Sequence, residues 1–268
     1  MSVKDGIPSR MATVVQISDP HLFASRDGGL HGVATWPRFE RALHEIQRRW
    51  PHAERLIITG DIAHDEVRDT YALLREVLGP WAQRTRVIPG NHDHRTDLQA
   101  VFQGQHCGPD GAWMGFEDHL GTWQLLGLDT HQPGCEAGGL SETQLAWCAE
   151  RLASHAPGPS LLFMHHPPVP VGSHWLDVIA LDEPATFHAM MQNNPHVEGI
   201  LCGHVHQHFE GRLHGCPVLA TPSTAYQFVP RVPHFQRDSK PAGFRVLELA
   251  VGGWSTEVVR LRPAAGPL

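Results

Sequence analysis

Short apolar runs recur along most of the chain and predict strands. They lie at residues 13–17 (TVVQI), 55–59 (RLIIT), 85–88 (TRVI), 123–128 (WQLLGL), 161–164 (LLFM) and 199–202 (GILC). Short, nearly continuous apolar runs are typical of strands that are buried on both faces. After residue 207 the segments FEGRLHG, PVLATPS, FRVLELAV and TEVVRLR predict a β-rich end.

Amphipathic segments between these runs predict helices. Residues 36–50 carry apolar side chains at helical spacing, and Asp65 and Gly79-Pro80 are the expected start and stop of a second helix. Ser141 and Gln144 have the spacing of a capping box at the start of a third. Strands that alternate with helices indicate a layered α/β fold. We expect one domain over residues 1–268, with a core at about 13–261 and a frayed tail at 262–268.

The composition is that of a globular protein. Apolar residues make up 41 % and charged residues 18 %, which is enough apolar material for a large core. The formal net charge of −7 argues against sequence-independent binding to nucleic acid. The chain has no apolar run long enough to span a membrane, and its first residues lack the apolar core of a secretory signal.

The cysteines indicate a reducing compartment. There are five, an odd number, and no two have C-x-x-C spacing. This argues against a disulfide framework or a zinc ribbon, so we expect a cytoplasmic protein with buried, inert thiols.

Histidine is the unusual residue type, with 21 in the chain. Five times an apolar run leads directly into side chains that commonly bind metals. These are S-D-P-H at Asp19 and His21, G-D at Asp61, G-N-H-D at Asn91, His92 and Asp93, H-H at His165 and His166, and G-H-V-H at His204 and His206. In open α/β sheets the carboxyl ends of the strands form the binding crevice, so we expect these clusters to meet.

The donor set predicts two metal ions. Oxygen and imidazole ligands without cysteine suit Fe, Mn, Zn or Co. There are more donors than one ion needs, and a pair of ions sharing a carboxylate serves displacement at phosphorus. Gly60, Gly90 and Gly203 let the backbone turn close to such ions. A hydroxide held on metal would attack a phosphodiester, since bound water has its pKa lowered to about 7.

The ordered blocks D-x-H, G-D, G-N-H-D, H and G-H-x-H resemble the calcineurin-like metallophosphoesterases. SDPHLFA, LSETQLAW, HHPP and LCGHVHQ further resemble the bacterial class III cyclic AMP phosphodiesterases, over about residues 13 to 261. The resemblance implies a metallo-dependent phosphatase fold, a four-layer α-β-β-α sandwich of two mixed β-sheets. It also implies hydrolysis of 3′,5′-cyclic AMP to 5′-AMP.

The resemblance implies a role for each site residue. The first metal would be held by Asp19, His21 and His206, and the second by Asn91, His165 and His204, with Asp61 bridging the two. His92 would lie beside the phosphate and protonate the leaving oxygen, and Asp93 would orient His92. The expected substrate contacts are His21, Asn91, His92, His206, Trp175 and Tyr226.

Several points stay open at this stage. Phe23 and Phe228 are further candidates for the rim of the base pocket, and His174 and His208 for the rim or the phosphate. His94, His166 and Asp129 fit either a supporting or a local structural role, and the remaining histidines are expected to be ordinary core or surface residues. His64 stands where purple acid phosphatases carry a tyrosine, so a ferric tyrosinate site is not supported.

The substrate and the metals also stay open. Fe and Mn are expected, with Zn or Co as alternatives. Other candidate substrates are a glycerophosphodiester, a 2′,3′-cyclic nucleotide or a broad range of phosphate esters, and a non-catalytic scaffold is the remaining alternative. The expected partner is a small cyclic nucleotide rather than nucleic acid or a membrane, and the resemblance is compatible with a homodimer.

Overall fold

Two mixed β-sheets form the centre of the molecule. The computed structural model describes residues 11–262. The first sheet has five strands in the order β16-β15-β1-β4-β5, and β1 pairs parallel with β4 but antiparallel with β15. Its strands are β1 (Ala12–Ile17), β4 (Arg55–Thr59), β5 (Thr85–Ile88), β15 (Gly243–Ala250) and β16 (Gly253–Arg260).

The second sheet has seven strands in the order β11-β12-β10-β9-β8-β7-β6. Its inner strands β12, β10, β9 and β8 are parallel, and antiparallel strands flank them on both sides. The strands are β6 (His106–Cys107), β7 (Met114–Leu120), β8 (Trp123–Leu128), β9 (Ser160–Met164), β10 (Val197–Cys202), β11 (Phe209–Leu213) and β12 (Cys216–Ala220).

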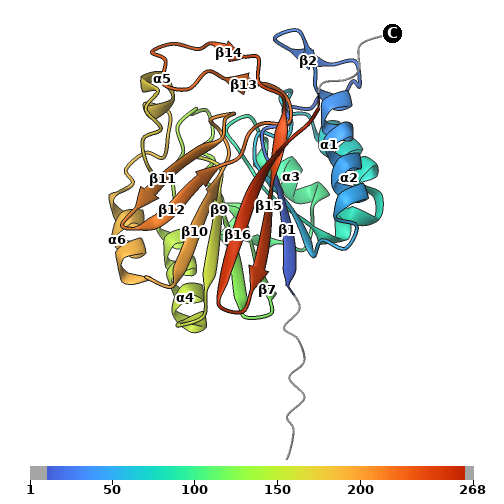
Figure 1. Cartoon of the computed structure of the whole chain (residues 1–268). Coiled ribbons are helices and arrows are strands. Elements are labelled where there is room, and N and C mark those ends of the chain that lie inside the picture. Colours follow the sequence, from blue (N-terminus) through green and yellow to red (C-terminus); the bar gives the residue numbers. More distant parts are fainter. Residues whose placement is uncertain (1–10, 263–268) are drawn as a thin grey trace, which may run out of the picture.

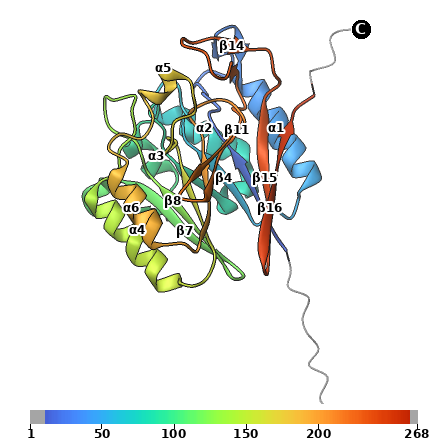
Figure 2. The same cartoon turned by 60° about the vertical axis from the view of Figure 1, so that its left-hand side comes forward.

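Helices cover the outer faces of the two sheets. Figure 2 shows α4 and α6 on one side of the molecule and α1 on the other, with the strands between them. The helices are α1 (Thr35–Arg49), α2 (Arg68–Leu78), α3 (Arg95–Val101), α4 (Glu142–His155), α5 (His174–Asp177) and α6 (Ala185–Asn193), with short 3-10 turns η1 (Gly79–Arg84) and η2 (Pro109–Gly111). Two small ribbons, β2 (Gly29–Leu30) with β3 (Val33–Ala34) and β13 (Gln227–Phe228) with β14 (Arg237–Asp238), lie at one end (Figure 1).

Successive side chains along each strand point to opposite faces of its sheet, which explains the layers of the fold. In β4, Leu56 and Ile58 pack with the helices α1 and α2, whereas Ile57 faces the second sheet. In β9, Leu162 packs with the outer helices and Phe163 faces the first sheet. Each such side chain stabilises the fold by about 1.5–3 kcal/mol on burial. The predicted four-layer arrangement with two mixed sheets is confirmed.

The second helix begins differently from the prediction. Its N-cap residue is Val67, not Asp65. α2 ends at Leu78, and η1 begins directly at Gly79, whose φ is 52°. The Asp65 carboxylate instead accepts hydrogen bonds from the Thr70 hydroxyl (2.7 Å) and the Ala24 N–H (2.6 Å). Asp65 therefore ties the loop after β1 to the start of α2.

Only one of the two hydrogen bonds of a capping box forms at α4. The Ser141 hydroxyl accepts from the Gln144 N–H at 3.3 Å, as expected for an N-cap. The Gln144 side chain, however, bonds both the backbone N–H and the carbonyl of Asp129, each at 2.7 Å. It thus fixes the loop after β8 rather than closing the box.

The pattern analysis missed several elements. β7 carries charged residues in its sequence MGFEDHL, and α3 is only seven residues long, so neither gives a strong periodic signal. The expected frayed tail at 262–268 lies, apart from Arg262, outside the described residues. Within residues 11–262, no helix combines the length and the hydropathy that crossing a membrane requires.

Candidate active site

The five polar blocks meet where parallel strands of both sheets end. β1, β4 and β5 of the first sheet lead to Asp19, Asp61 and Asn91, and β9 and β10 of the second lead to His165 and His204. Backbone hydrogen bonds join these loops, for example from the Asp19 N–H to the Gly60 carbonyl (3.1 Å). The site is therefore assembled from both sheets.

The backbone is strained at five of the expected ligands. Asp19, His21, Asp61, His204 and His206 have φ values of 51°, 45°, 51°, 68° and 45°. This left-handed region is uncommon for residues with a side chain, and it persists where the surrounding structure enforces it. Here it turns each side chain toward one point immediately after its strand.

Asp61 lies at the centre of the cluster. Its Oδ2 is 3.5 Å from His21 Nε2, and its Oδ1 is 3.4 Å from His165 Nε2. The carboxylate thus presents one oxygen to each half of the site, as a bridging ligand does.

The first half contains Asp19, His21 and His206. The Nε2 atoms of His21 and His206 are 3.0 Å apart, and His206 Nε2 is 3.6 Å from Asp19 Oδ1. One potential ligand atom from each of these residues and Asp61 lies within 4.8 Å of the others, and all four are buried.

The second half is organised around the Asn91 side chain. Asn91 Oδ1 is 3.2 Å from His165 Nε2 and 3.1 Å from His204 Nδ1. The structure therefore brings together all seven residues expected to bind metal: Asp19, His21, Asp61, Asn91, His165, His204 and His206.

Two glycines are required by close approach. A Cβ on Gly60, whose φ is 87°, would lie 2.4 Å from His165 Nδ1. A Cβ on Gly90 would lie 2.3 Å from Asp61 Oδ1. Any side chain at either position would displace a central residue of the cluster.

The donor set fits cations. Nδ1 of His165 donates to the Thr59 carbonyl (2.7 Å) and Nδ1 of His206 to the Tyr226 carbonyl (3.0 Å), which leaves both Nε2 lone pairs facing the cluster. Asp19 Oδ2 is buried without a hydrogen-bond partner. Buried polar atoms are rarely left unpaired, so this oxygen indicates a missing partner such as a metal ion.

The electrostatics agree with this fit. Burial lowers the pKa of His21 and His204 to about 3, so both rings are neutral and offer lone pairs at pH 7. Burial also disfavours a charged His165, but the Asp61 carboxylate beside it raises the pKa of His165 to about 9. The carboxylates thus stabilise a positive charge here, which is what a metal cation supplies.

Asp93 does not orient His92 as expected. Its carboxylate accepts from the N–H groups of Gly90 (2.8 Å) and Ile62 (3.0 Å) and from the Tyr71 hydroxyl (3.1 Å). Because these donors use its lone pairs, Asp93 holds the G-N-H-D turn against the loop after Asp61. His92 is instead placed through its own N–H, which donates to Asp61 Oδ1 at 3.0 Å.

The three candidates for a supporting role have different surroundings. His166 is fully buried, with Nδ1 2.7 Å from the Thr130 hydroxyl and Nε2 3.1 Å from the Glu136 carbonyl, so neither nitrogen is free for a metal. His94 is half-exposed and pairs with Asp97. Asp129 is buried and holds Arg95 through a bond of 2.6 Å, a local structural role.

The comparisons with known proteins follow this geometry. The family model for calcineurin-like phosphoesterases matches residues 12–208. The chain belongs to this family. It is 35 % identical over 250 residues to a 3′,5′-cyclic adenosine monophosphate phosphodiesterase of Escherichia coli, a match that covers 92 % of this chain and 89 % of the relative. It is 31 % identical over 250 residues to a 3′,5′-cyclic-nucleotide phosphodiesterase of Nostoc, covering 93 % and 92 %.

Solved structures share the fold of this family member. A dimetal phosphatase from Danio rerio aligns with a TM-score of 0.65 and 14 % identity, covering 93 % of this chain and 99 % of that one. A purple acid phosphatase from yellow lupin aligns with a TM-score of 0.69 and 13 % identity, covering 95 % of this chain and 52 % of that one. At these identities the likeness concerns the fold alone.

The sequence analysis missed the place of His64 in the site. Its Nδ1 is 3.2 Å from His21 Nδ1, and its ring centroid is 4.8 Å from that of His92. These three histidines form a further cluster of potential ligand atoms at the edge of the first half. The available signal was its position three residues after Asp61.

The aromatic candidates lie at different depths. The Tyr226 ring packs against His206 and His21, with centroids 4.8 and 5.8 Å apart, and is only 5 % exposed. Phe228 stacks on His206 at 4.2 Å, and Trp175 contacts Phe228 rather than any expected ligand. Tyr226 therefore supports the ligands directly, whereas Trp175 lies one ring farther out.

The remaining rim candidates lie outside the cluster. Phe23 contacts the His64 ring at 5.3 Å. His208 pairs with Glu210 at 3.0 Å, and His174 is exposed at the start of α5.

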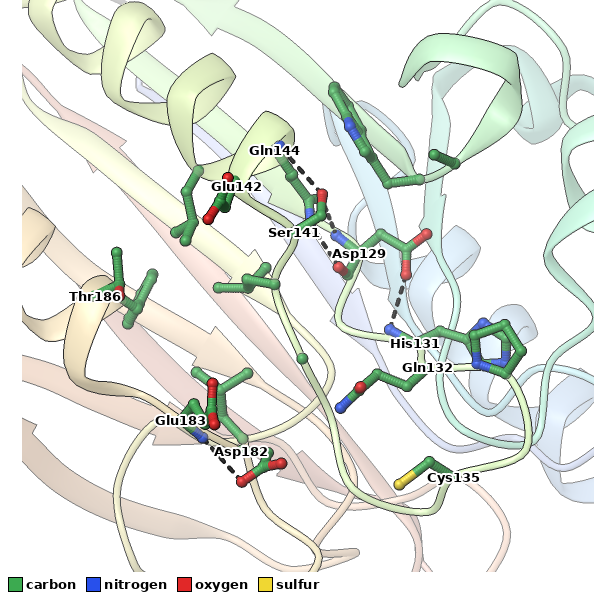
Figure 3. A pocket seen from close by; sticks show the side chains of 18 of the residues that line it. Asp129, His131, Gln132, Cys135, Ser141, Glu142, Gln144, Asp182, Glu183 and Thr186 are labelled. Atoms are coloured by element: carbon green, nitrogen blue, oxygen red, sulfur yellow. Dashed lines mark hydrogen bonds between the residues drawn. The ribbon is translucent and has the colours of Figure 1, made fainter.

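A cavity of about 570 Å³ lies beside the loop after β8 (Figure 3). Figure 3 shows the Asp129 carboxylate accepting from the His131 N–H, at 2.8 Å, and Gln144 bonding the Asp129 backbone. Asp182 and Glu183 line the opposite wall (Figure 3), so the cavity is predominantly acidic.

Proposed function

We propose that this protein is a dinuclear metal-dependent phosphodiesterase that hydrolyses 3′,5′-cyclic AMP to 5′-AMP. The observation that carries the proposal is the convergence of ligand-type side chains from both sheets on Asp61. The relatives named as cyclic nucleotide phosphodiesterases support the choice of substrate.

The proposed ligand sets follow the two halves of the cluster. Asp19, His21 and His206 hold the first metal, and Asn91, His165 and His204 hold the second. Asp61 holds both, because each of its oxygens faces one half. Iron and manganese suit these oxygen and imidazole donors.

When bound, the pair of cations supplies a nucleophile at neutral pH and neutralises charge on the phosphate. The chain's own residues do the rest. The Asn91 side-chain oxygen lies between His165 and His204. The N–H groups of the same amide would be available to bind a phosphate oxygen. His92 is half-buried at the edge of the cluster and donates a proton to the departing ribose oxygen.

We assign the base of the nucleotide to the aromatic side of the site. Tyr226 borders the first half of the cluster, and Trp175 extends the aromatic surface through Phe228. This assignment rests on the stacking that a purine needs, since the metal ligands recognise only the phosphate.

We further propose that one domain spanning 1–268 carries this activity in the cytoplasm. All five cysteines are free, which suits a reducing compartment.

The test is steady-state kinetics combined with metal analysis of the same preparation. We expect about two metal ions per chain and a higher kcat/KM for 3′,5′-cyclic AMP than for 2′,3′-cyclic AMP, glycerophosphodiesters or monoesters. Asp61→Asn should abolish hydrolysis of bis(p-nitrophenyl) phosphate without unfolding the protein. A wild-type enzyme that prefers another ester would overturn the substrate, and an active Asp61→Asn would overturn the metal mechanism.

A further inference from the structure

A second cavity, of about 300 Å³, adjoins the candidate active site across the ring of Tyr226. Tyr226 lines this cavity and also packs against the rings of His21 and His206. The β2–β3 ribbon and the β13–β14 ribbon, which flank the cavity, lie at the same end of the molecule (Figure 1). The other lining residues are Gly32, Val33, Arg38, Arg237, Asp238, Ser239 and Lys240.

The lining carries three cations and one carboxylate. Lys240 Nζ pairs with Asp238 at 3.2 Å. Arg38 and Arg237 donate only to backbone carbonyl groups, and no carboxylate of residues 11–262 lies within ion-pair distance of either. Two guanidinium groups that lack a counter-ion among the described residues are notable in a chain whose formal net charge is −7.

Neighbouring features increase the local positive potential. Burial lowers the pKa of Arg38, and the like charges of Arg41 and Arg237 lower it further. Arg38 belongs to the first turn of α1, which contains no acidic residue, and the N-cap Ala34 makes no side-chain capping bond. The positive end of this helix dipole therefore also favours an anion.

We propose that this cavity is a second, non-catalytic site that binds a phosphate group. Guanidinium groups present paired N–H donors that match phosphate oxygens, and a dianion would compensate the two unpaired charges. The volume is at the lower end for small-molecule sites, so the ligand class is inorganic phosphate or a small phosphate monoester. The Tyr226 ring offers an apolar wall to the organic part of such an ester.

This inference goes beyond the proposed function, because it does not depend on which ester the metal site hydrolyses. The test is calorimetric titration of the metal-loaded enzyme with inorganic phosphate, which should show two phosphate sites per chain. In Arg38→Gln/Arg237→Gln the second site should weaken by about tenfold or more. The matched control is Arg48→Gln, on the last turn of the same helix, which should keep both sites.

Two further variants separate this proposal from the proposed function. Asp61→Asn should lose phosphate binding at the metal cluster and keep the site in the second cavity. The double variant could also lose turnover of bis(p-nitrophenyl) phosphate. In that case Lys240→Gln is the test of the second site, because the Lys240 side chain is 59 % exposed and tolerates the change. Unchanged phosphate affinity of the second site in both Arg38→Gln/Arg237→Gln and Lys240→Gln, or a wild-type enzyme with one phosphate site, would overturn the proposal.

The nature of the ligand follows from three parallel titrations. In the Asp61→Asn background we expect 5′-AMP and inorganic phosphate to bind and adenosine not to bind. Tighter binding of 5′-AMP would assign the cavity to a nucleotide, and equal binding would assign it to free phosphate. Binding of adenosine as tight as that of 5′-AMP would contradict a phosphate site.

Discussion

At the residue scale, the site depends on backbone positions as much as on ligands. Asp19, Asp61 and His204 adopt left-handed φ values, and Gly60 and Gly90 leave space that a methyl group would fill. Strained residues cost about 1–3 kcal/mol each, and they persist because several strands enforce them. The strained backbone lowers the free energy of unfolding, but it fixes the arrangement of the donor atoms.

Gly90→Ala should impair the site without unfolding the protein. The new Cβ would lie 2.3 Å from Asp61 Oδ1 and 2.4 Å from the Asp61 N–H nitrogen, so Asp61 must move. We expect at least a tenfold weaker affinity for Mn²⁺, measured by calorimetry. Gly134→Ala is the control: its added methyl meets nothing within 4 Å, so the strain at its φ of 72° lowers stability without displacing a ligand. Equal Mn²⁺ affinity in both variants would contradict this view of Gly90.

His92→Ala should slow hydrolysis most for substrates with a poor leaving group. If His92 protonates the departing oxygen, its loss should slow hydrolysis of 3′,5′-cyclic AMP by about 10² to 10⁴. An aryl diester with a good leaving group needs no proton and should lose much less. Equal losses in kcat on both substrates would reduce His92 to a positioning role.

At the element scale, a buried polar network joins the two sheets beneath the site. Gln16 Nε2 donates to the Thr59 hydroxyl (2.9 Å) and to the Cys202 carbonyl (3.1 Å). The Thr221 hydroxyl donates to Gln16 Oε1 (2.6 Å), and Arg245 Nε donates to Thr221 (3.1 Å). Apolar packing between sheets has little directionality, so these bonds are suited to fixing their relative position.

Gln16→Met should therefore reduce metal affinity as well as stability. The substitution keeps the side-chain length but leaves the Thr221 and Thr59 hydroxyls short of a partner, at about 1–3 kcal/mol for each unpaired group. Metal titration and urea unfolding of the same samples measure both effects.

The control is Gln124→Met, in the first, turn-side half of β8, away from the end of the strands that carries the ligands. Gln124 is also fully buried and bonds Glu117 (2.7 Å) and the Arg151 carbonyl (3.1 Å), far along the strand from the ligands. It should lose stability but keep its metal affinity. Loss of affinity in both variants, or in neither, would contradict a positioning role for the network.

The elements themselves were largely predictable. The runs at 55–59 and 85–88 coincide with β4 and β5, because strands buried on both faces need continuous apolar sequence. Asp65 at the start of α2 was predicted wrongly, since Thr70 and the distant Ala24 N–H both compete for its carboxylate. Short or charged elements such as α3 and β7 lack the periodic signal that reveals a strand or helix.

At the scale of the whole molecule, the two sheets contribute different halves of one site. Without cations, burial raises the pKa of Asp19, and the neighbouring Asp61 carboxylate raises it further. Metal binding should therefore stabilise the folded protein, by an amount that rises with the logarithm of the metal concentration over Kd.

Removal of metal should lower thermal stability. We expect chelation to reduce the Tm of the wild-type enzyme and Mn²⁺ to restore it, while Asp61→Asn should show a much smaller difference between its two forms. Differential scanning calorimetry measures this. An unchanged Tm on chelation, with metal loss verified by elemental analysis, would show that the sheets hold the site without the ions.

The sequence by itself indicated which residues could bind metal, because each follows a strand and the carboxyl ends of parallel strands form the binding edge of a sheet. That the edges of two separate sheets meet was decided by the tertiary structure. Only the tertiary structure decided how these residues are arranged. It placed Asp93 against Ile62 and Tyr71 instead of His92 and brought His64 to His21. It also left Arg38 and Arg237 without a counter-ion among residues 11–262. These contacts join distant residues across two sheets, and their existence depends on sheet packing and loop conformation, which no local pattern encodes.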